Sequence, residues 1–194
     1  MFTLRFHYRG EYSGDPETLP AQRMEPNAVK FKEPEPEKLG LILNAASIVI
    51  LSATVAGAIL RAGGFGFFSA FGALLSLLVT FPHELIHACF FRGDVCMYTY
   101  LKIGAAFVIG EEDFSKARFV WMSIMPSMVF GFIPYIAFMI CPELRILGTM
   151  GAFCIAAGAG DYMNIVNALV QVPKGGKIFM HQMNSYWYLP VSDI

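Results

Sequence analysis

The sequence predicts an α-helical integral membrane protein with four transmembrane helices and short cytoplasmic β-strands. Of the 194 residues, 56% are hydrophobic and only 15% are charged, whereas a soluble domain usually carries about 25% charged residues. The mean hydropathy is +0.53. Four apolar stretches are long enough to cross a bilayer, namely residues 39–60, 67–91, 118–140 and 144–170.

The four apolar stretches form the predicted transmembrane core, residues 39–172. The first stretch is rich in alanine, glycine and serine, and small residues let membrane helices approach closely. The third stretch contains Pro126 and Pro134. Prolines are tolerated in membrane helices and often bend them around a cavity.

Two polar segments flank this core, and each is expected to contain a strand. In the N-terminal segment, residues 1–38, the alternation of apolar and polar residues over 2–8 is typical of a strand. The same segment lacks the apolar stretch of a cleavable signal peptide. In the C-terminal segment, residues 173–194, another strand is expected at 177–190.

The longest internal connection, residues 92–117, is expected to contain β-structure. Residues 95–109 are rich in β-branched and aromatic residues, which indicates a β-hairpin or a partly membrane-embedded strand pair. The acidic residues 111–113 are interpreted as the solvated start of a polar helix rather than as metal ligands. We expect some of the strands at 2–8, 95–109 and 177–189 to pair into a small sheet.

The distribution of Lys and Arg predicts the orientation in the cell membrane. With four crossings, both termini lie on the same side as the 92–117 connection. That side holds 12 of the 14 basic residues, and the opposite side holds only Arg61 and Arg145. Because basic residues concentrate in cytoplasmic segments, the sequence predicts a multi-pass protein with both termini in the cytoplasm.

A His-Glu-x-x-His motif lies inside the second apolar stretch. His83 and His87 are four residues apart, so on a helix both imidazoles project from one face. This spacing is typical of two zinc ligands, with Glu84 as the general base. Ionisable side chains are costly in a membrane helix unless they bind something, which favours a metal site over a pair of structural histidines.

Asp161 is the predicted third metal ligand. It is the only acidic residue deep in the fourth apolar stretch, and catalytic zinc usually has three protein ligands. Asp161 and His83 should also lie at similar depths in the membrane, roughly 13–15 Å from the cytoplasmic ends of their helices. Asn164 follows one turn later and is a candidate substrate or oxyanion contact, or a helix-packing residue. The histidines outside the apolar stretches, His7 and His181, are not expected to bind metal.

The chain resembles the DUF3267 family of zincin membrane peptidases. The resemblance rests on residues 83–88 (HELIHA), 114–119 (FSKARF), 160–161 (GD) and 185–188 (SYWY). In layout this family is similar to the site-2 proteases, which are intramembrane zinc metallopeptidases.

That resemblance implies a Zn²⁺ site with two histidines and a distal aspartate as ligands. These roles fall on His83, His87 and Asp161, and the role of general base falls on Glu84.

The function expected from these observations is hydrolysis of peptide bonds in membrane-embedded or juxtamembrane polypeptides. The expected partners are membrane lipid and a membrane protein or peptide substrate, whereas a net charge of −1 does not indicate nucleic acid. The alternative is a non-catalytic zinc-binding membrane scaffold or chaperone, and a hydrolase acting on another bond also stays open. Transport is disfavoured because polar residues do not continue across the bilayer.

Overall fold

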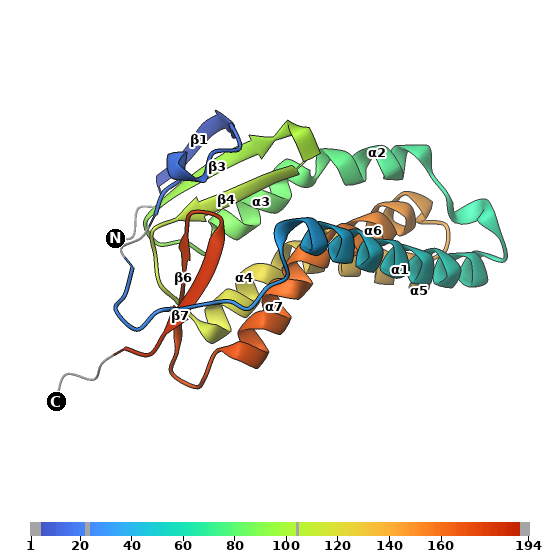
Figure 1. Cartoon of the computed structure of the whole chain (residues 1–194). Helices are drawn as coiled ribbons and strands as arrows, with labels where there is room; N and C mark the ends of the chain where they lie inside the picture. Colours follow the sequence, from blue (N-terminus) through green and yellow to red (C-terminus); the bar gives the residue numbers. More distant parts are fainter. Residues whose placement is uncertain (1–4, 22–23, 104, 191–194) are drawn as a thin grey trace. The chain divides into compact units, whose positions relative to one another are not determined.

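The computed structural model describes residues 5–21, 24–103 and 105–190 and corrects the predicted fold class. These residues form helices α1–α7 and strands β1–β7 (Figure 1). The strands belong to two sheets, so the fold is a mixture of helix and sheet rather than an α-helical protein with short strands. The strands pair because each backbone N–H and C=O group needs a hydrogen-bond partner, which an isolated strand does not supply.

The chain divides into two compact units, which are described separately. The first contains the described residues of 1–32, 84–123 and 164–194, and the second contains residues 33–83 and 124–163. The boundaries pass through helices α3, α4 and α7.

The first unit contains a three-stranded sheet in the order β1-β3-β4 (Figure 1). Strand β1 (Arg5–Glu11) is parallel to β3 (Asp94–Tyr100), and β3 forms an antiparallel hairpin with β4 (Ala105–Gly110). The hairpin expected at 95–109 is therefore present. The first strand runs from residue 5 to residue 11, and residues 2–4 of its predicted range lie outside the described residues.

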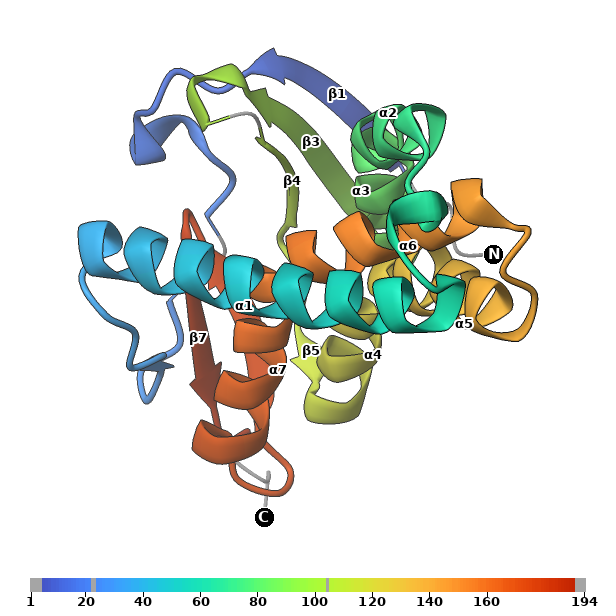
Figure 2. The same ribbon diagram turned by 90° about the vertical axis from the view of Figure 1, so that its right-hand side faces the viewer.

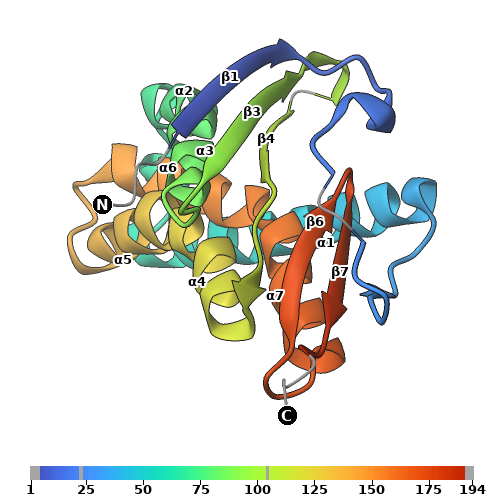
Figure 3. The same ribbon diagram turned by 90° about the vertical axis from the view of Figure 1, so that its left-hand side faces the viewer.

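A second sheet in the same unit has the order β2-β7-β6-β5. It contains β2 (Val29–Lys30), β5 (Phe114–Ser115), β6 (Lys177–His181) and β7 (Asn184–Tyr188). The single strand expected at 177–190 is instead the β6–β7 hairpin (Figure 3). The chain reverses at Gln182, whose φ of 55° is in the left-handed region, a conformation suited to tight turns.

Aromatic residues form much of the core of the first unit. Phe114 of β5 is fully buried, and its ring lies edge-on to Phe91 at 4.9 Å and to Phe119 at 6.2 Å between centroids. Val95 and Ile178, one from each sheet, belong to the same cluster. The two sheets and the first turns of α4 (Lys116–Ser127) therefore share one apolar interior.

Helix α6 (Arg145–Ala157) is central to the second unit and packs against α1 (Pro36–Ala62), α2 (Ala70–Leu78) and α5 (Ile133–Ile140) (Figure 2). The approach of α5 to α6 requires a small residue at position 151. A Cβ atom on Gly151 would lie 2.6 Å from the backbone nitrogen of Tyr135 and 2.8 Å from the carbonyl oxygen of Gly131. Close packing at small residues is common between membrane helices.

Three of the four predicted helices are interrupted. Residues 67–91 contain α2 and α3 (Thr80–Ala88), which are separated at Val79. Because Pro82 has no N–H to donate to the Leu78 carbonyl, the first helix ends there. Residues 118–140 contain α4, a π-helical turn (Met128–Phe132) and α5. Residues 144–170 contain α6 and α7 (Ala159–Gln171), with a 48° bend between them.

Three helical segments of the described chain are long and apolar enough to cross a membrane: Glu37–Ala62, Ala70–Ala88 and Lys116–Ile140. The bent pair α6 and α7 makes a fourth if it counts as one span. Many large apolar side chains on α1 are exposed, including Leu41 at 72% and Leu60 at 84%. Such a surface is typical of a helix in contact with lipid.

Candidate metal centre

Helix α3 brings together the three ionisable side chains of the His-Glu-x-x-His motif. The potential ligand atoms of His83, Glu84 and His87 all lie within 4.8 Å of one another. Glu84 is 9% exposed and His87 is 7% exposed. Pro82 is the third residue of this helix, where a missing N–H costs no intrahelical hydrogen bond, so the motif begins in the first turn of an intact helix.

His83 contacts Asp161, the predicted third ligand, within the second unit. The Nε2 atom of His83 lies 3.2 Å from Oδ2 of Asp161, and the two side chains are 19% and 15% exposed. Tetrahedral zinc with bonds of about 2.0–2.1 Å separates two of its ligand atoms by about 3.3 Å. The observed separation therefore fits two ligands of one zinc ion as well as it fits a hydrogen bond.

His87 contacts the backbone of α4 within the first unit. Its Nδ1 atom lies 2.9 Å from the main-chain carbonyl oxygen of Met122. A carbonyl oxygen only accepts hydrogen bonds, so Nδ1 is the donor. A metal-binding histidine usually donates its second ring N–H in this manner, which fixes the ring and its tautomer.

Asp161 and Asn164 both lie on α7, and Asp161 is in its first turn. Gly158, which precedes the helix, is closely packed because a Cβ atom there would lie 2.4 Å from the hydroxyl oxygen of Ser127. Gly160 has open space around it, so it is not required for close packing. Asn164 is partly buried, and its contact with substrate stays a prediction.

Two of the three acidic residues before α4 have partners in the first unit and are not a solvated helix terminus. Glu112 forms an ion pair with Arg118 at 2.5 Å. Asp113 accepts a hydrogen bond from the Tyr188 hydroxyl at 2.6 Å. Burial and this neighbouring carboxylate raise the pKa of Tyr188.

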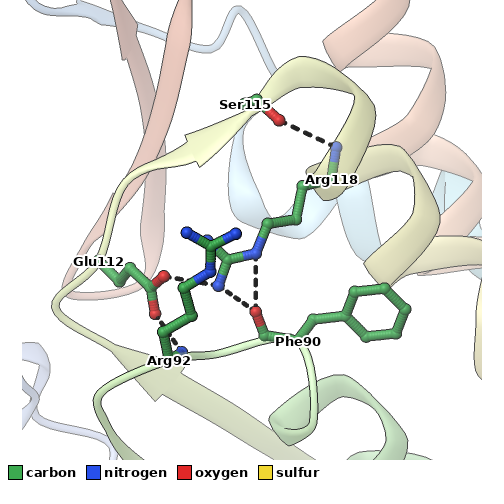
Figure 4. Close-up of polar contacts among 5 residues, drawn as sticks. All are labelled: Phe90, Arg92, Glu112, Ser115 and Arg118. Atoms are coloured by element: carbon green, nitrogen blue, oxygen red, sulfur yellow. Dashed lines mark hydrogen bonds and ion pairs between the residues drawn. The ribbon is translucent and has the colours of Figure 1, made fainter. Parts of the chain in front are cut away.

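Arg118 links α4 to the end of α3 (Figure 4). Its Nε atom donates to the carbonyl oxygen of Phe90 at 2.8 Å, and its Nη2 atom donates to the same oxygen. Phe90 follows α3 by two residues. The guanidinium also lies over the ring of Phe114, 4.5 Å from its centroid. The Glu112 carboxylate accepts a hydrogen bond from the backbone N–H of Arg92 at 2.6 Å. Sequence reasoning did not identify Arg118 as a residue that holds this helix.

The donor set of this centre is typical of zinc. Imidazole nitrogens and carboxylate oxygens are standard zinc ligands, and the described residues place two imidazoles on one helix and a carboxylate against the first of them. A helix with His-Glu-x-x-His and a distal carboxylate defines a protein of the zincin type.

The family comparison agrees with this class. The family DUF3267, described as "Putative zincin peptidase", matches residues 76–176. The match covers more than half of the chain, which therefore belongs to this family. No curated protein and no solved structure matches the chain. The matched range begins before the histidine motif and includes Asp161.

Proposed function

We propose that the protein is a zinc metallopeptidase that hydrolyses membrane-embedded or juxtamembrane polypeptides. The observation that carries this proposal is the 3.2 Å contact between His83 Nε2 and Asp161 Oδ2, made by residues 78 positions apart. With His87 on the same helix as His83, these residues supply the three ligands of a catalytic zinc site. Asn164 is proposed as a contact to the substrate or to the developing oxyanion.

Glu84 is proposed as the general base. Zinc, when bound, would acidify the attacking water and polarise the scissile carbonyl. Glu84 would take the proton from that water and return it to the leaving amine. Its side chain is adjacent to the first histidine and is 9% exposed, so bulk water competes little for the carboxylate.

The membrane setting of the proposal is supported by the apolar helices. Three helical segments, or four with the bent pair, have the length and composition of membrane spans. The excess of basic residues on one side favours cytoplasmic termini. A cell-membrane location with both termini in the cytoplasm would place polypeptides of the same membrane within reach of the site.

Substitution of Glu84 tests the catalytic part of the proposal. Glu84→Gln removes the base but leaves the ligands, so zinc content should stay near one per chain while cleavage is lost. The assay uses detergent-purified protein with a panel of single-span polypeptides tagged at both ends. Glu143→Gln, at an exposed carboxylate between α5 and α6, is the control and should retain cleavage. Zinc binding without cleavage in the wild type would favour a zinc-binding scaffold or chaperone instead.

A further inference from the structure

The main-chain carbonyl of Met122 has lost its usual donor within α4. In an α-helix, the carbonyl of residue i accepts the N–H of residue i+4. For Met122 that residue is Pro126, which lies inside α4. Proline has no N–H, and its ring crowds the carbonyl four residues earlier. This carbonyl is therefore available to a donor outside the helix.

His87 is that donor. Its Nδ1 atom lies 2.9 Å from the Met122 carbonyl oxygen, and both residues are 7% exposed. Buried carbonyl groups need a partner, and little water reaches this one. Because Nδ1 carries the proton, a neutral imidazole carries its lone pair on Nε2.

We infer that Pro126 is a positioning residue for His87. By leaving the Met122 carbonyl without an intrahelical donor, it provides the acceptor that fixes the His87 ring and selects Nε2 as the metal-binding atom. The inference rests on the proposed function only in taking His87 as a metal ligand. The hydrogen bond itself requires no metal.

A purely structural role for Pro126 predicts a different result. Prolines also bend helices, and a bend alone would leave the tautomer of His87 unchanged. Pro134 provides a matched control because it is a buried proline in α5, directly after the π-helical turn, and it does not lie four residues after Met122.

The experiment compares Pro126→Ala and Pro134→Ala with the wild type in detergent. Metal-free protein with ¹⁵N-labelled histidine is studied by NMR at a pH where imidazole is neutral, and the His87→Gln variant identifies the His87 signals. Zinc affinity is measured by competition with a chelator. In Pro126→Ala the new N–H competes for the Met122 carbonyl, so the Nδ1–H signal of His87 should weaken and zinc affinity should fall about 10-fold or more. Pro134→Ala should change neither.

Two results would overturn the inference. One is a neutral wild-type His87 that carries its proton on Nε2 rather than on Nδ1. This result would overturn the inference even if the Pro126→Ala variant did not fold. The other is a Pro126→Ala protein with the tautomer and zinc affinity of the wild type. Failure of the wild type to bind zinc would instead overturn the proposed function, and the NMR signals would still decide whether Pro126 controls the ring.

Discussion

Arg118→Met should destabilise the protein more than the loss of an ordinary surface arginine. The Arg118–Glu112 pair is 2.5 Å long, and each side chain is only 19% exposed. Removing one partner of a fully buried ion pair typically costs about 3–5 kcal/mol. This pair is partly exposed and Glu112 keeps its hydrogen bond from the Arg92 N–H, so loss of the ion pair alone should cost no more than about the lower end of that range. The variant also loses the hydrogen bonds to the Phe90 carbonyl and the contact with the Phe114 ring. These contributions to the free energy of unfolding overlap, so we expect the variant to lose about 3–5 kcal/mol of stability in total.

The assay is thermal unfolding of the detergent-purified protein, followed by circular dichroism. For a chain of this length, such a loss corresponds to a fall in Tm of roughly 10 °C. Arg118→Lys should lose less, because lysine keeps the charge but not the planar fork of donors. Arg145→Met, at an exposed arginine of α6, is the control and should change stability by less than about 0.5 kcal/mol.

A double variant separates the ion pair from the other contacts of the guanidinium. If the buried charge of Glu112 causes most of the loss, Arg118→Met combined with Glu112→Gln should be more stable than Arg118→Met alone. An Arg118→Met protein as stable as Arg145→Met would refute the reasoning.

Further predictions concern the metal, a thiol and the packing of small residues. Asp161→Ala should lower zinc affinity, measured by chelator competition, by more than about 100-fold. Losing a metal ligand should weaken zinc binding more than losing a residue that only hydrogen-bonds to a ligand. Unchanged affinity would place the third ligand elsewhere. The hydrogen bond from Cys141 to Glu143 raises the pKa of the Cys141 thiol, so less thiolate is present near pH 8 and maleimide labelling should be slow. Glu143→Gln removes that effect and should speed labelling at the same pH, whereas an equal rate would contradict the assignment. Gly151→Ala should cost about 1–3 kcal/mol by overpacking, while Gly160→Ala, in open space on α7, should be neutral or stabilising in the same unfolding assay.

The spacing of residues along the chain was sufficient to predict that the two histidines of the motif lie on one helix. His83 and His87 share a helical face because they are four residues apart, and this local relation does not depend on the rest of the fold. The apolar stretches likewise correspond to helices. Hydrophobicity alone does not reveal where hydrogen bonding is interrupted, and the apolar stretches gave no sign of the π-helical turn after α4. The breaks at Val79 and Gly158 lie where Pro82 and the glycines of residues 158–160 favour an opening of the helix.

The sheets show the limit of local patterns. Alternation and β-branched residues indicated where strands lie, but strand order depends on pairing between distant segments. The parallel pairing of β1 with β3 joins residues near 5 to residues near 94. The C-terminal hairpin was interpreted as one strand because its turn, Gln182 and Met183, lacks the glycine or asparagine that usually signals a reversal.

By itself, the sequence determined the donor types of the candidate metal centre, the spacing of the two histidines on one helix and the apolar character of the helices, because these follow from residue identity and helical period. Only the tertiary structure decided which distant groups meet them. It placed Asp161 against His83, the Met122 carbonyl against His87 and Arg118 at the end of α3. Such contacts join residues 28 to 78 positions apart, and they depend on how the whole chain packs rather than on any local pattern.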